Sequence, residues 1–459
     1  MNFEPNACSA ANRVLACVLA TLLAIGHAGL PSAAAAPANE IASFTLDNGM
    51  QVVVIPDHRV PIVAHSVWYK VGSVDDGPGL SGRAHFLEHM MFKATKKYPK
   101  RYLDLAVANA GGYDNATTNY DVTSYYEVVP KQFLSEMMAF EADRMTNIQF
   151  TGEELEIERG AILQERKMRI DSSPINRLKE RMRAELYAGT NYELMPAGTE
   201  EGDRAVTTAS AFELYRRTYG PNNAILVVAG DVSLEEVQQL AKQHFGAVPR
   251  MAEPPSRPSG LDSRPISVKR FQERDAQVTY PGLGRYYRIP AEDSEDYYPL
   301  FILMNHLNIY TGRLNTELVQ KLHVASSVGA EIESTRLGAL FGIGGTAAPG
   351  VPLATLESAL DAALEDIRRN GVQANEVDRL VKAIESQIVF DQDDIVQRMS
   401  DYGEYLAAGR SMDWIDSRVT RMKRVTAADV ARVAQHYLAP ENAITGELLP
   451  AAQSISIAP

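Results

Sequence analysis

An internal repeat constrains the fold of this chain more than any other feature of its sequence. The segment VTTASAFELYRRTYGPNNAI begins at Val206, and it aligns without gaps with VTAADVARVAQHYLAPENAI, which begins at Val425. Each copy predicts a helix, a proline-containing turn and an entering strand. The alternative is a chance likeness between two common helix–turn–strand units. Because a stretch rich in Pro, Ser and Gly separates the copies, we favour a duplication that produced two related domains.

The stretch rich in Pro, Ser and Gly, together with a signal-like pattern at the N-terminus, determines the predicted domain boundaries. We expect a signal peptide at residues 1–36, a first domain at 37–252, a linker at 253–265 and a second, homologous domain at 266–459. Strand patterns mix with long helical patterns, which indicates α/β or α+β layers. We predict the α+β class, with a mixed β-sheet and packed helices in each domain.

The N-terminal stretch has the pattern of a secretory signal. Arg13 precedes an apolar run from Val14 to Gly26, and small residues with A-x-A cleavage options follow around Ala33 to Ala36. The run is shorter than the ~20 residues of a membrane span. A membrane anchor, or a buried helix behind a misassigned start codon, is the alternative. We expect an exported chain, periplasmic or secreted, with no membrane span after cleavage.

Composition narrows the choice of partners and of metal ligands. The net charge is −13 and there is no long basic run, which argues against a nucleic-acid partner. The only two cysteines, Cys8 and Cys17, lie inside the predicted signal. The mature chain would therefore have no disulfide and no thiol nucleophile, so histidines and carboxylates would have to bind any metal.

The stretch HFLEH places His85 and His89 four residues apart, with Glu88 directly before the second histidine. On a helix the two imidazoles project from one face and can bind the same ion. Glu88 lies beside that face, where it could act as a general base on a metal-bound water. An ordinary solvated helix face is the alternative, since short motifs are only hypotheses. A catalytic zinc takes three protein ligands, so a third must come from elsewhere.

A charged helical stretch at residues 151–172, TGEELEIERGAILQERKMRIDS, offers the third ligand. Glu158 and Glu165 lie two turns apart on one face of this predicted helix. Spacing alone does not choose among the glutamates of the stretch, which also include Glu153, Glu154 and Glu156.

The inverted zinc motif H-x-x-E-H and its surroundings resemble the pitrilysin/insulinase family of metallopeptidases, which includes the mitochondrial processing peptidase. The segments that match the family, in order, are LDNGMQVVVIPD, GLSGRAHFLEHMMFKATKKYP, GGYDNATTNYDVTSYY, ERGAILQE and YGPNNAILVVAGDV. The resemblance covers nearly the whole chain after the predicted signal. It is to two-domain bacterial members and to the zinc-bearing subunit of the processing peptidase, and it implies two domains arranged as half a clamshell.

The resemblance implies roles for individual residues. His85, His89 and Glu165 would bind one zinc ion per chain, and Glu88 would be the general base. Glu158 matches a glutamate that supports the metal ligands without binding the ion. For Glu158, a surface charge on an exposed turn is the alternative.

The segment DNATTN matches the edge strand that binds extended peptides in the family. Asn115 and Ala116 would contact the main chain of the substrate, which would add to the sheet as a further strand. A plain turn containing Asn115 is the alternative.

The second half of the chain departs from the family. Active single-chain relatives carry there an Arg and a Tyr, seven residues apart, that hold the substrate and stabilise the oxyanion. In the matching stretch, GRLNTELVQKLHVASSVGA, Val319 and Ser326 occupy these positions, and neither can replace the pair. We therefore expect a homologous partner subunit that carries the Arg–Tyr pair and forms a heterodimer. A homodimer is the other assembly.

These features predict an exported zinc metalloendopeptidase, a hydrolase of peptide bonds in unfolded peptides or small proteins. The main alternative is a non-catalytic subunit that binds peptides or serves as an assembly scaffold, because fold alone does not determine function. The missing Arg–Tyr pair favours the scaffold, whereas the intact ligands and Glu88 favour the enzyme. A zinc hydrolase of non-peptide amides is a third alternative.

Overall fold

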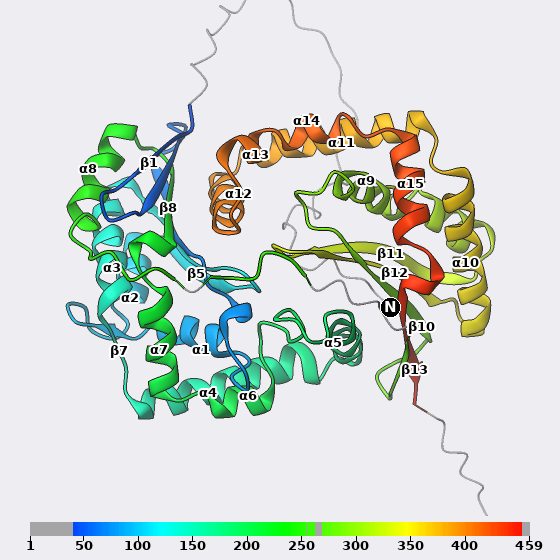
Figure 1. Ribbon diagram of the computed structural model, residues 1–459, viewed down its shortest axis with the longest axis horizontal. Coiled ribbons are helices and arrows are strands. Elements are labelled where there is room, and N and C mark those ends of the chain that lie inside the picture. Colours follow the sequence, from blue (N-terminus) through cyan, green and yellow to red (C-terminus); the bar gives the residue numbers. More distant parts are fainter. Residues whose placement is uncertain (1–39, 255, 262–268, 452–459) are drawn as a thin grey trace, which may run out of the picture.

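Two β-sheets, each with its own helices, form two domains that lie side by side in the computed structural model (Figure 1). The structure describes residues 40–254, 256–261 and 269–451. The predicted signal peptide lies outside these residues, as does part of the predicted linker. The α+β prediction is confirmed. Within the described ranges, no helix combines the length and the apolar character needed to cross a membrane.

The N-terminal domain is built on a six-stranded sheet in the order β1-β2-β8-β3-β6-β5. The strands of this domain are β1 (Ala42–Thr45), β2 (Gln51–Pro56), β3 (Ile62–Tyr69), β4 (Ala94–Thr95), β5 (Tyr113–Thr118), β6 (Thr123–Pro130), β7 (Ile148–Gln149) and β8 (Ala224–Gly230), of which β4 and β7 form a separate pair. The helices are α1 (Arg83–Met90), α2 (Tyr102–Ala110), α3 (Leu134–Asn147), α4 (Gly152–Arg166), α5 (Pro174–Leu186), α6 (Glu200–Ala205), α7 (Thr208–Thr218) and α8 (Leu234–His244). Short helical turns are η1 (Ser73–Asp75), η2 (Lys131–Phe133), η3 (Lys167–Asp171) and η4 (Pro221–Asn223).

The C-terminal domain has a five-stranded sheet in the order β11-β12-β10-β13-β9. Its strands are β9 (Arg270–Asp275), β10 (Gly282–Ile289), β11 (Ala325–Ser334), β12 (Ala339–Ala347) and β13 (Ala443–Pro450). Its helices are α9 (Tyr297–Asn308), α10 (Leu353–Asn370), α11 (Ala374–Asp391), α12 (Ile395–Ala407), α13 (Met412–Asp416), α14 (Arg418–Met422) and α15 (Ala427–Tyr437), with the helical turns η5 (Asn315–Lys321) and η6 (Pro440–Asn442).

The sequence repeat forms the same structure twice. Thr207 caps α7 and Thr426 caps α15, each through its side-chain oxygen and a capping box. A proline-containing turn then leads into β8 or β13, each of which has a neighbouring strand on both sides. β8 pairs parallel with β2 and antiparallel with β3, and β13 pairs in the same way with β9 and β10. The equivalent pairing confirms two related domains.

One helix from each half of the chain packs on the sheet of the other domain. α12, from the C-terminal half, packs on β3 and β8 of the first sheet, whereas α5 packs on β9 and β13 of the second sheet. Both helices lie between the two sheets in Figure 1. Met399 and Leu406 of α12 share a core with Trp68, while Met182 of α5 shares one with Ile444. The exchange buries the inner face of both sheets and joins the domains.

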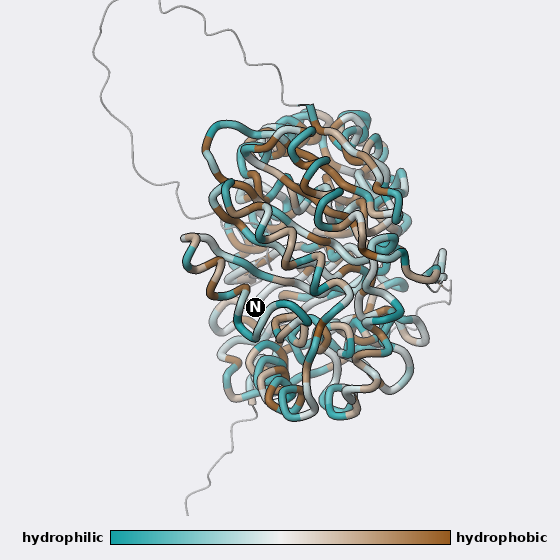
Figure 2. Tube along the Cα trace, turned by 90° about the vertical axis from the view of Figure 1, so that its left-hand side faces the viewer, coloured by the Kyte–Doolittle hydropathy of each residue, from teal (hydrophilic) through white to brown (hydrophobic). Residues whose placement is uncertain are grey.

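The remaining apolar faces form the cores of the individual domains. In the first domain, α1, α3, α7 and α8 contribute buried residues to one cluster with the outer face of the sheet. Figure 2 views the molecule from this side and shows apolar stretches alternating with hydrophilic turns along the trace. α1 therefore lies against the sheet with one face in the core, which leaves its polar face for the site described below.

Candidate metal centre

Helix α1 carries the HFLEH motif, as predicted, and its N-terminus is held firmly. Gly82 precedes the helix with φ of 91°, in the left-handed region that favours glycine. The buried carboxylate of Asp76 accepts hydrogen bonds from the backbone N–H groups of Gly82 and Ala84, both at 2.7 Å. Phe86 and Leu87 are fully buried in the core. These contacts fix the direction in which the histidines point.

Helix α4 supplies the carboxylates opposite α1. It begins with a capping box in which Thr151 accepts from the backbone N–H of Glu154 while the Glu154 side chain accepts from Thr151. Glu156 is paired with Arg159, and Glu153 is exposed. Among the described residues, none of these three glutamates forms a hydrogen bond or ion pair with His85 or His89.

Glu165 is the glutamate that meets both histidines. Its Oε1 lies 3.8 Å from Nε2 of His85, and its Oε2 lies 3.3 Å from Nε2 of His89. The two imidazole rings have centroids 4.9 Å apart and are nearly perpendicular. One potential ligand atom from each of the three residues lies within 4.8 Å of the others, and this is the one such His/Cys/Asp/Glu group among the described residues.

The charges of the cluster suit a divalent cation. Burial, together with the nearby His89, lowers the pKa of His85 to about 4, so its imidazole is neutral and has a free lone pair at ordinary pH. The hydrogen bond from His89 lowers the pKa of Glu165 to about 2, which keeps this carboxylate ionised. For His89, burial lowers the pKa but the adjacent carboxylates outweigh it and raise it. Two imidazoles and one carboxylate form a donor set that zinc accepts, with a fourth position left over.

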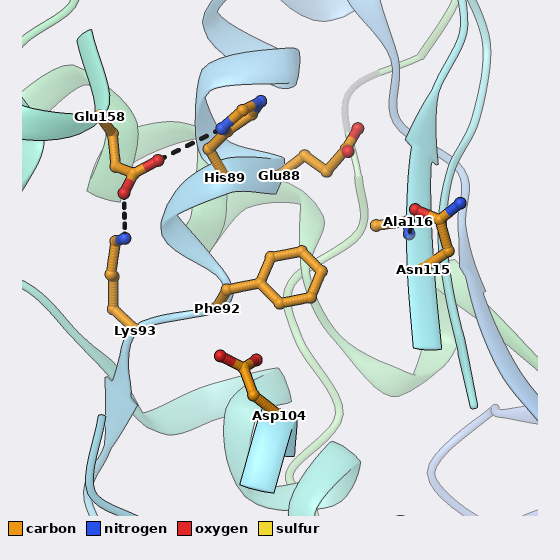
Figure 3. Close-up of a pocket in the computed structure, with 8 residues that line it drawn as sticks. All are labelled: Glu88, His89, Phe92, Lys93, Asp104, Asn115, Ala116 and Glu158. Carbon is orange, nitrogen blue, oxygen red and sulfur yellow. Dashed lines mark hydrogen bonds and ion pairs between the residues drawn. The ribbon is translucent and has the colours of Figure 1, made fainter. Parts of the chain in front are cut away.

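Glu158 contacts His89 at the ring nitrogen that does not face Glu165. Its Oε2 lies 3.3 Å from Nδ1 of His89, and its other oxygen is paired with the Lys93 ammonium (Figure 3). A carboxylate on Nδ1 holds the proton of His89 on that nitrogen and leaves Nε2 free to bind a metal. Glu158 is therefore a partly buried side chain with two partners.

Glu88 lies beside the cluster, near strand β5 (Figure 3). It is 9% exposed, and burial raises the pKa of its carboxyl group, against a lowering by its hydrogen bond with Thr118. The Thr118 hydroxyl donates to Oε2 of Glu88 at 2.5 Å. A pocket of about 300 Å³ opens here; its lining consists of Glu88, His89, Phe92, Lys93, Asp104, Asn115, Ala116 and Glu158.

Asn115 and Ala116 lie on β5, at the free edge of the first sheet. β6 pairs with β5 on one side, with Asn115 opposite Tyr126 and Ala116 opposite Tyr125. The Ala116 N–H donates to the side-chain oxygen of Asn115 at 2.9 Å, so it does not bond to β6. Both residues line the pocket beside Glu88. The segment is a strand and not a turn.

Val319 and Ser326 lie away from this pocket, in the second domain. Val319 is part of η5 and packs against the core of that domain. The Ser326 hydroxyl contacts the carbonyl oxygens of Thr346 and Ala347 at 3.3 and 3.4 Å. Neither residue lines the pocket that Glu88 borders.

Sequence reasoning missed three residues of this site. Thr118 follows Ala116 by two positions, so the alternation of a strand would have placed both on the face that meets α1. Lys93 follows His89 by four positions, which is the spacing of neighbours on a helix. Asp76 gave no local signal, because its contact with α1 is made across a loop.

Comparison with known proteins identifies relatives of the whole chain. Residues 51–200 match the family model described as Insulinase (Peptidase family M16), and residues 205–384 match the Peptidase M16 inactive domain. The zinc protease PqqE of Helicobacter pylori is 28% identical over 418 residues, which cover 89% of this chain and 92% of the relative.

Solved structures share the two-domain fold. The crystal structure of a protease from Helicobacter pylori has a TM-score of 0.84 at 26% identity and covers 90% of this chain and 100% of that one. The periplasmic protease PqqL from Escherichia coli has a TM-score of 0.76 at 22% identity; the match covers 91% of this chain but 48% of PqqL.

The sequence and the fold thus match a class of two-domain proteins that includes a named zinc protease and a protease of known structure. The chain belongs to the insulinase family of peptidases, family M16. Its second domain has the hydrophobic helix α9 where the first has α1, and α9 carries no H-x-x-E-H motif. The metal-type cluster is thus confined to the first domain of the described chain.

Proposed function

We propose that this protein is an exported zinc metalloendopeptidase that hydrolyses peptide bonds in unfolded peptides or small proteins. One zinc ion per chain would be held by His85, His89 and Glu165. The observation that carries the proposal is the convergence of these three side chains beside a buried carboxylate, Glu88, in one pocket. A structural scaffold has no need of such an arrangement.

Zinc bound by these residues would supply Lewis acidity, which acidifies water and polarises the carbonyl group of a peptide. Glu88 would take the proton from the attacking water and pass it to the leaving amine. Its burial supports this role, because a carboxyl group with a raised pKa gives up a proton less readily and can carry it between the two steps. Glu158 would hold His89 in the correct tautomer.

The free edge of β5 would bind the substrate. An extended peptide can add there as a further strand, so that main-chain hydrogen bonds provide affinity with little demand on sequence. The Ala116 N–H now bonds to the Asn115 side chain and would exchange this partner for a substrate carbonyl. Asn115 and Ala116 would thereby place the scissile bond beside Glu88.

A homologous partner subunit would complete the site. The resemblance to active relatives calls for an Arg–Tyr pair, and Val319 and Ser326 stand in its place. PqqL, which this chain matches over 48% of its length, has room in one chain for a second half of similar size. We propose that a separate subunit provides that half here, in a heterodimer, with a homodimer as the alternative.

Export rests on the N-terminal pattern and on one relative. Residues 1–36 have the apolar run and the small residues of a signal peptide. The structural neighbour PqqL is described as periplasmic. We propose that this chain acts in the periplasm or outside the cell.

The test is hydrolysis of a mixed set of unfolded peptides by the zinc-loaded chain, with Glu88→Gln as the control. We expect cleavage to fall about 10²–10⁴-fold in the variant, the usual contribution of a general base, while zinc content stays near one per chain. The assay is run on the chain alone and on the chain with any homologous subunit that co-purifies. Cleavage only with the partner supports the heterodimer.

The second candidate is a peptide-binding or assembly scaffold without catalysis. It is favoured by the missing Arg–Tyr pair, and by the description of the second matched domain as inactive. No cleavage with or without the partner, in a chain that binds peptides equally well as wild type and as Glu88→Gln, would establish it.

A further inference from the structure

We propose that Thr118 is a positioning residue for Glu88: its hydroxyl anchors one carboxylate oxygen and leaves the other free to move the proton. This inference rests on the proposed function, in which Glu88 is the general base. It concerns the orientation of the Glu88 carboxylate.

The two oxygens of Glu88 have different surroundings. Oε2 accepts the Thr118 hydroxyl at 2.5 Å, whereas Oε1 has no hydrogen-bond partner in the part of the chain that the structure describes. A carboxylate that shuttles a proton needs one oxygen with an open lone pair in a defined place. The Thr118 bond stops rotation of the group and so makes Oε1 that oxygen.

Neighbouring groups determine the direction of the Thr118 hydrogen bond. Thr118 Oγ1 also lies 3.2 Å from Oγ1 of Thr123. The Thr123 hydroxyl donates to the backbone carbonyl of Val71 at 2.9 Å, and a carbonyl can only accept. The single proton of Thr118 goes to the nearer acceptor, the Glu88 carboxylate.

The same strand would hold the substrate. β5 carries Ala116, at the edge where a peptide would add, and Thr118, two residues further along on the same face. One rigid element would therefore place both the scissile bond and the base. A misplacement of ~1 Å between reacting groups can cost about 10²-fold in rate. Holding the scissile bond and Glu88 on the same strand would therefore protect the reaction rate.

The experiment compares three substitutions on β5. Thr118→Val has the same shape but no donor, and Thr118→Ser keeps the donor. Thr117→Val is the matched control: Thr117 contacts Ser124 and not Glu88. We expect Thr118→Val to lower kcat about 10–100-fold with KM changed less than about threefold. Thr118→Ser and Thr117→Val should stay within about threefold of wild type, with zinc content and Tm preserved in all three.

A wild-type kcat in Thr118→Val would overturn the proposal. So would an equal loss in Thr118→Ser, because that variant keeps the hydroxyl donor and should therefore keep the position of Glu88. Crystal structures of wild type and variants give a readout that does not depend on activity. The Glu88 carboxylate should leave its position in Thr118→Val and keep it in Thr117→Val.

An unmoved Glu88 carboxylate in Thr118→Val refutes the positioning role even if the wild-type chain proves inactive. Conversely, an inactive wild type in which Thr118→Val does displace Glu88 refutes the peptidase proposal and supports the structural part of this one. The two proposals therefore fail by different observations.

Discussion

Three glutamates around His85 and His89 differ in their surroundings, and these differences predict different effects of substitution. Glu165 faces both Nε2 atoms and is held ionised by His89. Glu158 is paired with His89 Nδ1 and Lys93. Glu88 is buried and has the Thr118 hydroxyl as its partner. These contacts support the proposed roles of Glu165 as metal ligand, Glu158 as its support and Glu88 as general base.

Glu158→Ala should weaken zinc binding about 10–100-fold, the usual effect of removing a partner of a ligating histidine. The substitution frees His89 to rotate and leaves the Lys93 ammonium unpaired near the site. Competition with a chromogenic chelator measures the affinity. Glu153→Ala is the control on the same helix, since Glu153 is exposed at its first turn. Equal affinity in both variants would make Glu158 a simple surface charge.

Asp203 predicts a pH-dependent stability. It is fully buried on α6, and neither carboxylate oxygen has a hydrogen-bond partner among the described residues. Burial raises its pKa from 3.8 to about 7. Because the folded pKa exceeds the unfolded one, its favourable contribution is complete below about pH 4 and is lost as the pH rises to about 7.

Asp203→Asn should therefore gain stability relative to wild type between about pH 4 and 7, by about 2–4 kcal/mol in total, and the gain should level off above pH 7. Replacing the carboxyl group with an amide also has a cost that does not depend on pH, and this cost cancels when the difference between variant and wild type is compared across pH values. Denaturant unfolding at several pH values measures this difference in the free energy of unfolding. Glu201→Gln, on an exposed position of the same helix, should show no such trend. A difference in unfolding free energy between Asp203→Asn and wild type that does not change with pH would contradict the prediction.

At the scale of elements, the exchanged helices depend on close contacts. α12 crosses the first sheet at Gly403, where an added Cβ would overlap the indole ring of Trp68. Trp68 itself is held by a hydrogen bond from its ring N–H to Ser66 Oγ at 2.8 Å. The ring cannot move aside without losing this bond, so the position requires glycine for packing.

Gly403→Ala should destabilise the protein by about 1–3 kcal/mol, the usual cost of overpacking a filled core. Gly160→Ala is the matched control, because a Cβ there meets no atom within 4 Å and the residue lies on the exposed side of α4. Alanine in a helix interior should stabilise by about 0.5–1 kcal/mol. Chemical denaturation compares both. A stable Gly403→Ala variant would show that α12 can shift on the sheet.

At the scale of the whole molecule, neither domain is complete by itself. α12 covers the first sheet and α5 the second, so that cutting the chain between the domains exposes both faces. The residues that the first sheet would expose include Val53, Ile55, Ala64, Trp68, Ile225 and Val227. Apolar patches of this kind promote association when they are uncovered.

Residues 40–254 expressed alone should therefore aggregate or bind a hydrophobic dye, whereas co-expression with residues 269–451 should recover a soluble complex. Size-exclusion chromatography and dye fluorescence measure both outcomes, and the uncut chain is the reference. A monomeric 40–254 fragment with the Tm of the whole chain would contradict the prediction.

Local signals in the sequence determined much of this protein. Asn48 and Gly49 lie in the turn between the paired strands β1 and β2, the side chain of Ser233 caps α8, and the two copies of the repeat form the same helix, turn and strand. Such features depend on neighbours within a few residues, so periodicity and capping residues are enough to predict them. The H-x-x-E-H motif belongs to this class, because a single helical turn aligns its histidines.

Only the tertiary structure decided which partners these local elements meet. Spacing left five glutamates open on α4, and the packing of α4 on α1 turns Glu165 toward both histidines and Glu158 toward His89 Nδ1. The bond between Thr118 and Glu88 and the exchange of α5 and α12 are likewise contacts between distant segments. They depend on how sheets and helices pack as bodies, and no periodicity along the chain records that arrangement.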